Sequence, residues 1–316
     1  MPIIDIRDLL IKECIGEKVY YYPNPGNGGD SLIALATYQT FDRIDIEYET
    51  IDMDRDFDSK AKTVIYSGGG NLVKRGRNAA RFISKHHKSA KKLILLPHTV
   101  EANKVLLGQL GVNVHLVARE RRTYDYLVLH AKGANVYLAH DMAFSLDIKK
   151  VFSDGSSGVI SDVIRYFKGL FAGKGRSTMP ARSSKRLLAM FLVLLHRLKQ
   201  VRRHGQVDVL NAFRCDIEGR DFVKPSNNID LSAVFTFGTH SRKSVQTTVY
   251  ELLKYMEQYE VVNTDRLHIC IGSALLGKTV NFYANDYFKC EEVFKLSLVN
   301  FQNVKWKGNE VPSISQ

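Results

Sequence analysis

Short apolar runs alternate with amphipathic stretches between Lys18 and Asp147. Runs rich in β-branched and aromatic residues predict strands, and apolar residues at helical spacing predict helices. The predicted strands are Val19–Tyr22, Thr63–Tyr66, Leu93–Pro97, Val112–Val117 and Ala134–Leu138, and the predicted helices include Ser31–Phe41 and Asn78–His86. This βαβα order predicts a doubly wound parallel sheet with helices on both faces. Ligands of such sheets bind beyond the carboxyl ends of the strands, so the loops there are the candidate site.

A second α/β region is predicted after residue 206. Its predicted strands are Val207–Phe213, Ala233–Phe237, Val261-Val262 and Lys278–Tyr283, and its predicted helices are Ser244–Gln258 and Arg266–Leu276. The predicted fold class is therefore α/β with two Rossmann-like domains, which would face each other across a cleft. We place the N-terminal domain at 1–150, a basic helical insertion at 151–205 and the C-terminal domain at 206–316.

Charge is distributed unevenly along the chain. Hydrophobic residues make up 45% of the 316 residues and charged residues 25%, which is typical of a globular protein. Lys and Arg outnumber Asp and Glu by 45 to 33, and the resulting net charge of +12 favours anionic partners. The stretch from Val163 to Gln206 holds eleven Lys or Arg residues and no Asp or Glu. Nearly the whole surplus therefore lies in the insertion.

The insertion also contains an apolar run, Leu187–Leu195. Nine residues are too few to span a bilayer, for which about 20 are needed. We expect the insertion to lie against an anionic membrane surface. The alternative is a charged helical hairpin that packs on the second domain.

Location and metal content can be predicted from what the sequence lacks. The first 17 residues mix charged and apolar side chains and do not have the layout of a secretory signal peptide. We therefore expect a cytoplasmic location, at the inner face of the cytoplasmic membrane if the insertion binds lipid. The four cysteines are far apart and form no Cys/His cluster with metal-ligand spacing, so we expect no metal site.

Two glycine-rich segments directly follow predicted strands. In Pro25–Asp30, free backbone amides at a helix start can attract an anion, and Asp30 can cap the helix or act as a base. The alternative is a tight turn with Asp30 only as a cap. In Ser67–Leu72, three consecutive glycines each cost conformational entropy, so the close approach of a ligand explains them better than turn chemistry does.

Polar side chains follow other predicted strands. His98 and Arg119 each have a structural alternative, as a buried hydrogen-bonding residue and as an ion pair with Glu120. Arg266 and His268 stand at a predicted helix start, where arginine can bind a carboxylate or phosphate and histidine can exchange a proton. The alternative there is a capped helix with a surface arginine.

The order of these motifs resembles that of the polysaccharide pyruvyl transferase family. The motifs are Gly26–Asp30, Gly68–Leu72, Leu96–Thr99, Ala118–Glu120, Asp141–Phe144, Arg266–His268 and Tyr287–Lys289. Together they span residues 20 to 290. The chain departs from the family at His98-Thr99, where Gln-Ser is usual, and at Arg122-Thr123, where a serine is usual.

The resemblance implies a fold of the glycosyltransferase-B type and an activity. The enzyme would transfer pyruvyl from phosphoenolpyruvate to a hexose of a bacterial surface polysaccharide precursor, for capsule or exopolysaccharide. The expected product is a galactose 4,6-ketal with release of phosphate. Phosphoenolpyruvate would be a co-substrate, with no cofactor and no metal. An oligosaccharide on polyprenyl diphosphate would be the acceptor if the insertion binds a membrane.

The resemblance also implies residue roles. The catalytic residues would be His268 as acid or phosphate stabiliser, Arg266 as an anion contact and Asp30 as base, with His98 as the second candidate base. The donor-binding residues would be Arg214, Arg266, Leu267, His268 and Lys289. The acceptor-binding residues would be Asn27, Gly29, Gly69, Gly70, Asn71, His98 and Arg119. For Arg214 the alternative is a structural ion pair with Asp216 or Glu218.

Two other functions are compatible with parts of the sequence. A nucleotide-sugar glycosyltransferase with the same two-domain architecture could hold a diphosphate at Arg266. A nucleic-acid-binding protein could use the basic insertion, but few aromatics accompany its charges and the glycine loops would stay unexplained. We therefore expect no nucleic-acid partner.

Overall fold

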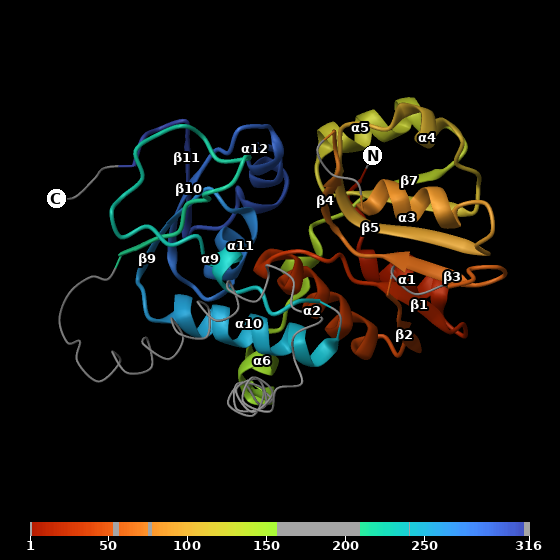
Figure 1. Ribbon diagram of the computed structural model, residues 1–316, viewed down its shortest axis with the longest axis horizontal. Helices are drawn as coiled ribbons and strands as arrows, with labels where there is room; N and C mark the ends of the chain where they lie inside the picture. Colours follow the sequence, from red (N-terminus) through yellow and green to blue (C-terminus); the bar gives the residue numbers. More distant parts are fainter. Residues whose placement is uncertain (1, 53–56, 75–77, 157–208, 240, 313–316) are drawn as a thin grey trace, which may run out of the picture. The chain divides into compact units, whose positions relative to one another are not determined.

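The computed structural model describes residues 2–52, 57–74, 78–156, 209–239 and 241–312 (Figure 1). The chain packs into two compact units, each with its own parallel sheet. Unit 1 comprises Met1–Pro25, Leu32–Asp147 and Tyr287–Gln302, and unit 2 comprises Gly26–Ser31, Ile148–Asp286 and Asn303–Gln316. These parallel sheets with helical connections confirm the Rossmann-like α/β fold class. Most of the basic insertion, including its charged stretch and its apolar run, lies outside the described residues.

The sheet of unit 1 has the strand order β2-β1-β3-β5-β6-β7, with β4 beside β5. Its strands are β1 (Val19–Tyr22), β2 (Tyr48–Thr50), β3 (Thr63–Tyr66), β4 (Gly69–Leu72), β5 (Lys92–Val100), β6 (Val114–Ala118) and β7 (Asn135–Leu138). All of these strands pair in parallel. Every residue of β5 except Lys92 is buried, which explains the continuous apolar run of this central strand. Because β2 and β3 lie on opposite sides of β1, the strand order reverses at β1, where doubly wound sheets bind ligands.

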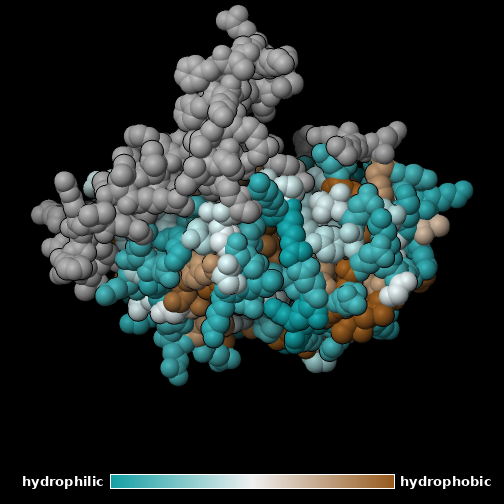
Figure 2. All heavy atoms as spheres, turned by 90° about the horizontal axis from the view of Figure 1, so that it is seen from below, coloured by the Kyte–Doolittle hydropathy of each residue, from teal (hydrophilic) through white to brown (hydrophobic). Residues whose placement is uncertain are grey.

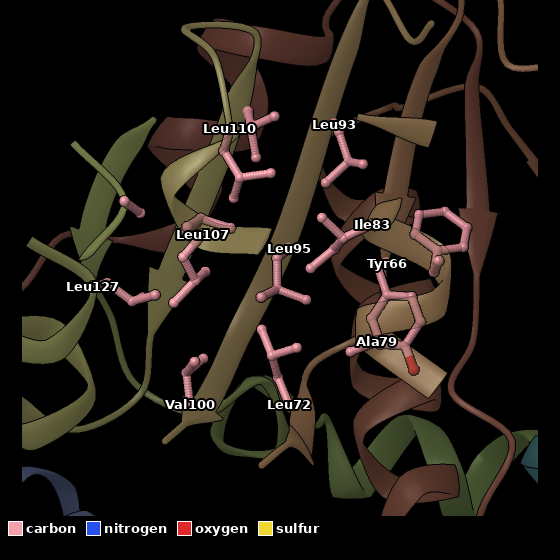
Figure 3. Packing of buried hydrophobic residues seen from close by; sticks show 14 of the residues in the cluster. Tyr66, Leu72, Ala79, Ile83, Leu93, Leu95, Val100, Leu107, Leu110 and Leu127 are labelled. Atoms are coloured by element: carbon pink, nitrogen blue, oxygen red, sulfur yellow. The ribbon is translucent and has the colours of Figure 1, made fainter. Parts of the chain in front are cut away.

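Helices cover both faces of this sheet, and one face holds a large apolar core (Figures 1 and 3). The helical elements of unit 1 are α1 (Ile6–Cys14), most of α2 (Gly28–Arg43), α3 (Asn78–His86), α4 (Lys104–Gly108), α5 (Arg121–His130), η1 (Met142–Ser145), α12 (Lys289–Val293) and η3 (Phe294–Leu298). In Figure 3, Leu93 and Leu95 of β5 point toward Ile83 of α3 and toward Leu107 of α4. Residues two apart in a strand share a face, so these leucines pack on the same side.

Unit 2 contains the second parallel sheet, with the order β11-β10-β9-β8. Its elements are α6 (Ile148–Asp154), β8 (Val209–Asn211), α9 (Leu231–Val234), α10 (Arg242–Glu257), β9 (Val261–Thr264), α11 (Leu267–Leu275), β10 (Thr279–Tyr283) and β11 (Val304–Gly308). Ser241 caps α10 through a hydrogen bond from the Ser244 amide. On the same helix, Gln246 donates to the carbonyl oxygens of Val151 and Gly155 and so holds α6 against α10.

Two sequence predictions about local structure were wrong. The predicted strand Ala233–Phe237 does not form. Ala233 and Val234 end the short helix α9, because the Asp230 side chain accepts from the Ala233 amide and caps a helical turn, and residues 235–237 lie outside helices and strands. The glycine-rich segment after β3 is not only a loop. Its residues Gly69–Leu72 form β4, which pairs with the end of β5.

Hydrophilic side chains cover most of the described surface in the view of Figure 2, and hydrophobic atoms emerge in smaller groups between them. Several exposed large hydrophobic residues are valines, such as Val105 and Val112. Among the described residues, no helix combines the length and the apolar character that crossing a bilayer requires.

Candidate functional site

Two arginines meet at the carboxyl edge of the sheet in unit 2. Strands β8 and β9 are parallel neighbours, so the segments that follow them start side by side. Arg214 comes three residues after β8 and Arg266 two residues after β9. Both arginines bind Asp216, whose Oδ1 accepts from Nε of Arg214 at 2.8 Å and whose Oδ2 accepts from Nη2 of Arg266 at 2.8 Å. The structure thus brings together two residues predicted to hold the donor.

Other carboxylates surround the two arginines. Glu218 pairs with Nη2 of Arg214 at 2.7 Å, and Asp230 forms an ion pair with Arg266. Asp230 also accepts from the Cys215 amide at 2.9 Å. Asp265 is fully buried and its Oδ1 accepts from the Arg214 amide at 2.8 Å. Burial raises the pKa of Asp265 to about 6, although nearby Arg214 and Arg266 favour its ionised form.

The glycine loop Gly26–Ser31 packs within the same unit, against the start of α11. A Cβ at Gly29 would lie 2.5 Å from Nδ1 of His268, and a Cβ at Gly28 would lie 2.6 Å from the Phe235 carbonyl oxygen. These contacts leave room only for glycine. Leu267, between Arg266 and His268, is buried in the core, so its side chain anchors the helix start.

The side chains of Asn27 and Asp30 both accept hydrogen bonds from backbone amides at the start of α2. Oδ1 of Asn27 accepts from the Gly29 amide at 2.8 Å, and Oδ2 of Asp30 accepts from the Asn27 amide at 2.9 Å. This is the arrangement of a capping box, which satisfies amides at a helix start. Asp30 therefore helps to cap α2 from the third residue of the helix, whereas Asn27 stands at the N-cap position, and the role of Asp30 as base stays a prediction.

In unit 1, a buried polar cluster lies at the carboxyl-end portions of β3 and β5 and just after β1. Nε2 of His98 accepts from the Asn71 amide at 3.0 Å, and Nδ2 of Asn71 donates to the Tyr66 hydroxyl at 3.0 Å. Tyr66 in turn donates to Oδ1 of Asn24 at 2.8 Å. Complete burial, together with the nearby charge of Arg119, lowers the pKa of His98 to about 3, so the ring is neutral. His98 thus fixes the Gly69–Leu72 strand.

Arg119 sits in a second buried network, at the end of β6. Its side chain is 1% exposed, its Nε donates to the Thr99 hydroxyl at 2.9 Å and its Nη1 donates to Oδ2 of Asp141 at 2.7 Å. Glu120 accepts hydrogen bonds from the Thr99 and Thr123 hydroxyls. Complete burial raises the pKa of Glu120 to about 7, against the opposing charge of Arg119.

Gly70 and Lys289 lie beside this network. A Cβ at Gly70 would be 2.8 Å from Nη2 of Arg119 and 3.6 Å from Cδ of Lys289. Lys289 is buried and belongs to unit 1, together with the rest of Tyr287–Gln302. Two of the three glycines of this segment therefore have a packing reason, since a Cβ at Gly68 would also lie 2.8 Å from the Pro97 carbonyl oxygen.

The predicted site residues fall into two groups, one in each unit. Unit 2 holds Asn27, Gly29, Asp30, Arg214, Arg266, Leu267 and His268, and unit 1 holds Gly69, Gly70, Asn71, His98, Arg119 and Lys289. The predicted roles of these residues in donor and acceptor binding stay predictions. The sequence analysis missed Asp230 and Asp265 as arginine partners, although an aspartate directly before Arg266 was a visible signal. In the described part of the chain, no group of three or more His, Cys, Asp or Glu side chains is arranged to hold a metal ion.

Comparison with known proteins identifies a family and a similar solved structure. The model of a family described as polysaccharide pyruvyl transferase matches residues 27–287. The crystal structure of a functionally uncharacterised protein from Klebsiella pneumoniae is similar, with 26% sequence identity and a TM-score of 0.70. That match covers 98% of this chain and 97% of the other. No curated protein matches the chain.

Proposed function

Because this chain belongs to the polysaccharide pyruvyl transferase family, we propose that it transfers pyruvyl from phosphoenolpyruvate to a hexose of a bacterial surface polysaccharide precursor. Family membership establishes the coarser statement, that the chain is a pyruvyl transferase acting on polysaccharide. The family match over residues 27–287 carries the proposal, since it covers the loops described above from Asn27 to His268. We further propose galactose as the hexose and a 4,6-ketal as the product.

The proposed chemistry sets requirements for the protein. Protonation of C3 of phosphoenolpyruvate makes C2 cationic, and one sugar hydroxyl adds there. A second hydroxyl then displaces phosphate and closes the ketal. Of the two hydroxyl protons, one replaces the proton delivered to C3 and the other leaves with phosphate. No electrons are transferred, so we propose phosphoenolpyruvate as co-substrate and no redox cofactor.

We assign the donor to unit 2. Arginine forks suit carboxylate and phosphate groups, and Arg214 and Arg266 converge on one carboxylate already. His268 lies in the first turn of α11, where free amides favour an anion, so it would act as the acid or stabilise the departing phosphate. Leu267 would contribute by fixing this turn. Lys289 is proposed as a further contact to the donor.

We assign the acceptor to the loops with Asn71, His98 and Arg119 in unit 1, and to Asn27, Gly29, Gly69 and Gly70. The two Rossmann-like units support a glycosyltransferase-B type of fold as part of this proposal. The basic stretch 163–206 supports an anionic membrane surface as partner, with a polyprenyl-diphosphate-linked acceptor. The location would then be the inner face of the cytoplasmic membrane.

The test is release of inorganic phosphate from phosphoenolpyruvate, measured with a panel of free and lipid-linked glycosides. We expect Arg266→Ala and His268→Ala to lower the rate by about 100- to 1,000-fold, because loss of one transition-state charge contact costs roughly 3–4 kcal/mol. Lys243→Ala, at an exposed position of α10, is the control and should keep the wild-type rate. Wild-type rates in both site variants would refute the donor site, and turnover of nucleotide sugars instead would indicate a glycosyltransferase.

A further inference from the structure

The arginine pair of unit 2 is surrounded by more negative than positive charge. Arg214 and Arg266 carry two positive charges, whereas three carboxylates contact them, those of Asp216, Glu218 and Asp230. Both arginine side chains are less than 10% exposed. Because charges interact strongly where water is largely excluded, a further anion would be repelled by this arrangement as it stands. An anion can bind the pair only if one carboxylate gives way.

The three carboxylates differ in how firmly they are held. The Asp230 side chain is 9% exposed and also accepts from the Cys215 and Ala233 amides, so it is part of the framework. Glu218 contacts only Arg214 of the two arginines. Asp216 bridges both and its Oδ1 also accepts from the Glu218 amide at 3.2 Å, but its side chain is 40% exposed. Asp216 can therefore turn into water without leaving a buried charge behind.

Asp216 also has the geometry of a bound anion. Its two oxygens accept from Nε and Nη2 of Arg214 at 2.8 and 3.1 Å, and Oδ2 accepts from Nη2 of Arg266 at 2.8 Å. A planar carboxylate held by two guanidinium groups is how arginines bind a small carboxylate or phosphate ligand. Partial burial opposes ionisation of Asp216, but hydrogen bonds and charges from both arginines outweigh it and hold its pKa below the ordinary value.

We propose that Asp216 occupies the anion position of the arginine pair and is displaced when a small carboxylate or phosphate ligand binds. Asp216 thus sets the affinity of the site. Without a ligand, Asp216 holds the two arginines in place. Because every anion must compete with its carboxylate, Asp216 weakens the binding of all of them. If the proposed function holds, the displacing ligand is phosphoenolpyruvate, and this identity is the only part of the inference that rests on it.

The test compares anion affinities by isothermal titration calorimetry of the full chain. The probes are inorganic phosphate, pyruvate and phosphoenolpyruvate, which separate phosphate from carboxylate recognition. Asp216→Asn removes the competing charge but keeps the side-chain shape, and we expect its dissociation constants to fall by about tenfold, as for loss of one partly screened charge interaction. Asp221→Asn, an exposed aspartate five residues on, is the matched control and should bind as wild type does.

Glu218→Gln separates displacement from simple charge removal. It also removes one negative charge from Arg214 but leaves Asp216 in place, so we expect a smaller gain in affinity than for Asp216→Asn. Equal gains in both variants, or weaker anion binding by Asp216→Asn, would overturn the displacement. If Asp216→Asn binds phosphate more tightly but the wild-type chain does not turn over phosphoenolpyruvate, this inference is supported and the proposed function is refuted. If the wild-type chain turns over phosphoenolpyruvate but Asp216→Asn has unchanged anion affinities, the proposed function is supported and this inference is refuted.

Discussion

Arg119 in unit 1 and Arg266 in unit 2 occupy equivalent positions, each in the loop that follows a parallel strand of its own sheet. Arg119 is 1% exposed and its hydrogen bonds go to Thr99 and to Asp141, a carboxylate with no exposed side-chain surface. Arg266 shares its ion pairs between buried Asp230 and the 40% exposed Asp216. Arg119 is therefore paired only with buried groups, whereas Arg266 has one partner, Asp216, that water can reach.

This difference shows why residue type at a strand end does not by itself identify a ligand contact. Both loops have an arginine next to an acidic residue, Arg119-Glu120 and Asp265-Arg266. The exposure of the partner distinguishes a structural ion pair from an exchangeable one. A charge that loses its partner without access to water stays buried and uncompensated, which costs several kcal/mol. The geometry therefore favours a positioning role for Arg119, and its contact with the acceptor stays a prediction.

The largest effect on stability is expected at Arg119. Arg119→Met leaves the buried Asp141 carboxylate without its cation, and breaking such a buried pair costs about 3–5 kcal/mol of unfolding free energy. Arg214→Met should cost less, because its partners Asp216 and Glu218 are partly exposed and can be hydrated. Urea denaturation followed by circular dichroism measures both values.

Arg122→Met is the control for this comparison. Arg122 is 58% exposed on the helix that follows Arg119, so its replacement should change stability by less than about 1 kcal/mol. The double variant Arg119→Met with Asp141→Leu should recover part of the loss, since it removes the stranded charge. A loss at Arg214 as large as that at Arg119 would contradict the distinction between the two sites.

The two sites should also differ in the pH range over which stability changes. Each contains one carboxyl with a raised pKa, Glu120 at about 7 and Asp265 at about 6, against ordinary values of 4.5 and 3.8. The folded state keeps each proton up to the higher pKa, so unfolding releases a proton between the two values. The free energy of unfolding therefore falls as pH rises through this window and is constant above it.

Glu120→Gln and Asp265→Asn isolate these contributions. Relative to wild type, we expect Glu120→Gln to gain about 3 kcal/mol between pH 4.5 and 7, since one pKa unit corresponds to about 1.4 kcal/mol. Asp265→Asn should gain about as much between pH 3.8 and 6. Urea titrations at a series of pH values give the differences, and subtraction of the wild-type curve cancels groups common to all three proteins. If the difference in unfolding free energy between Glu120→Gln and wild type does not change with pH, the Glu120 carboxyl does not keep its proton in the folded state.

The sequence predicts the secondary structure around both sites better than the contacts inside them. β1, β3 and α3 have the predicted bounds, because their apolar patterns are unambiguous. Arg214 and Arg266 were correctly placed at strand ends. For Arg214, the sequence left two interpretations, an ion pair with Asp216 and a contact to a ligand. A separation of two residues allows the ion pair but does not require it. The contact between Asp216 and Arg266 depends on how β8 and β9 pair, and the hydrophobic pattern of the sequence does not reveal this register.

Packing across long sequence separations was the other limit. The glycines at 68–70 were interpreted as room for a ligand, whereas Pro97, Arg119 and Lys289 already approach two of them. These neighbours lie 29 to 219 residues away in the sequence, so a local pattern could not reveal them. The same holds for Gly29, which was assigned to the N-terminal domain but packs against His268 in unit 2.

Among the variants of predicted site residues, the smallest change in folding free energy is expected for Asp30→Asn, and this variant separates two roles of one side chain. Asn retains an oxygen that can accept from the Asn27 amide, so the capping box survives and stability should change by less than about 1 kcal/mol. Asn cannot take a proton from a sugar hydroxyl, so loss of a general base would slow transfer by about 100- to 10,000-fold. Phosphoenolpyruvate affinity should stay near the wild-type value, because the cap geometry and both arginines are unchanged.

Asp42→Asn, at an exposed position of the same helix, controls for charge loss. Unchanged transfer by Asp30→Asn would leave Asp30 with the capping role alone, and equal loss of donor binding would show that the Gly26–Asp30 loop holds the donor.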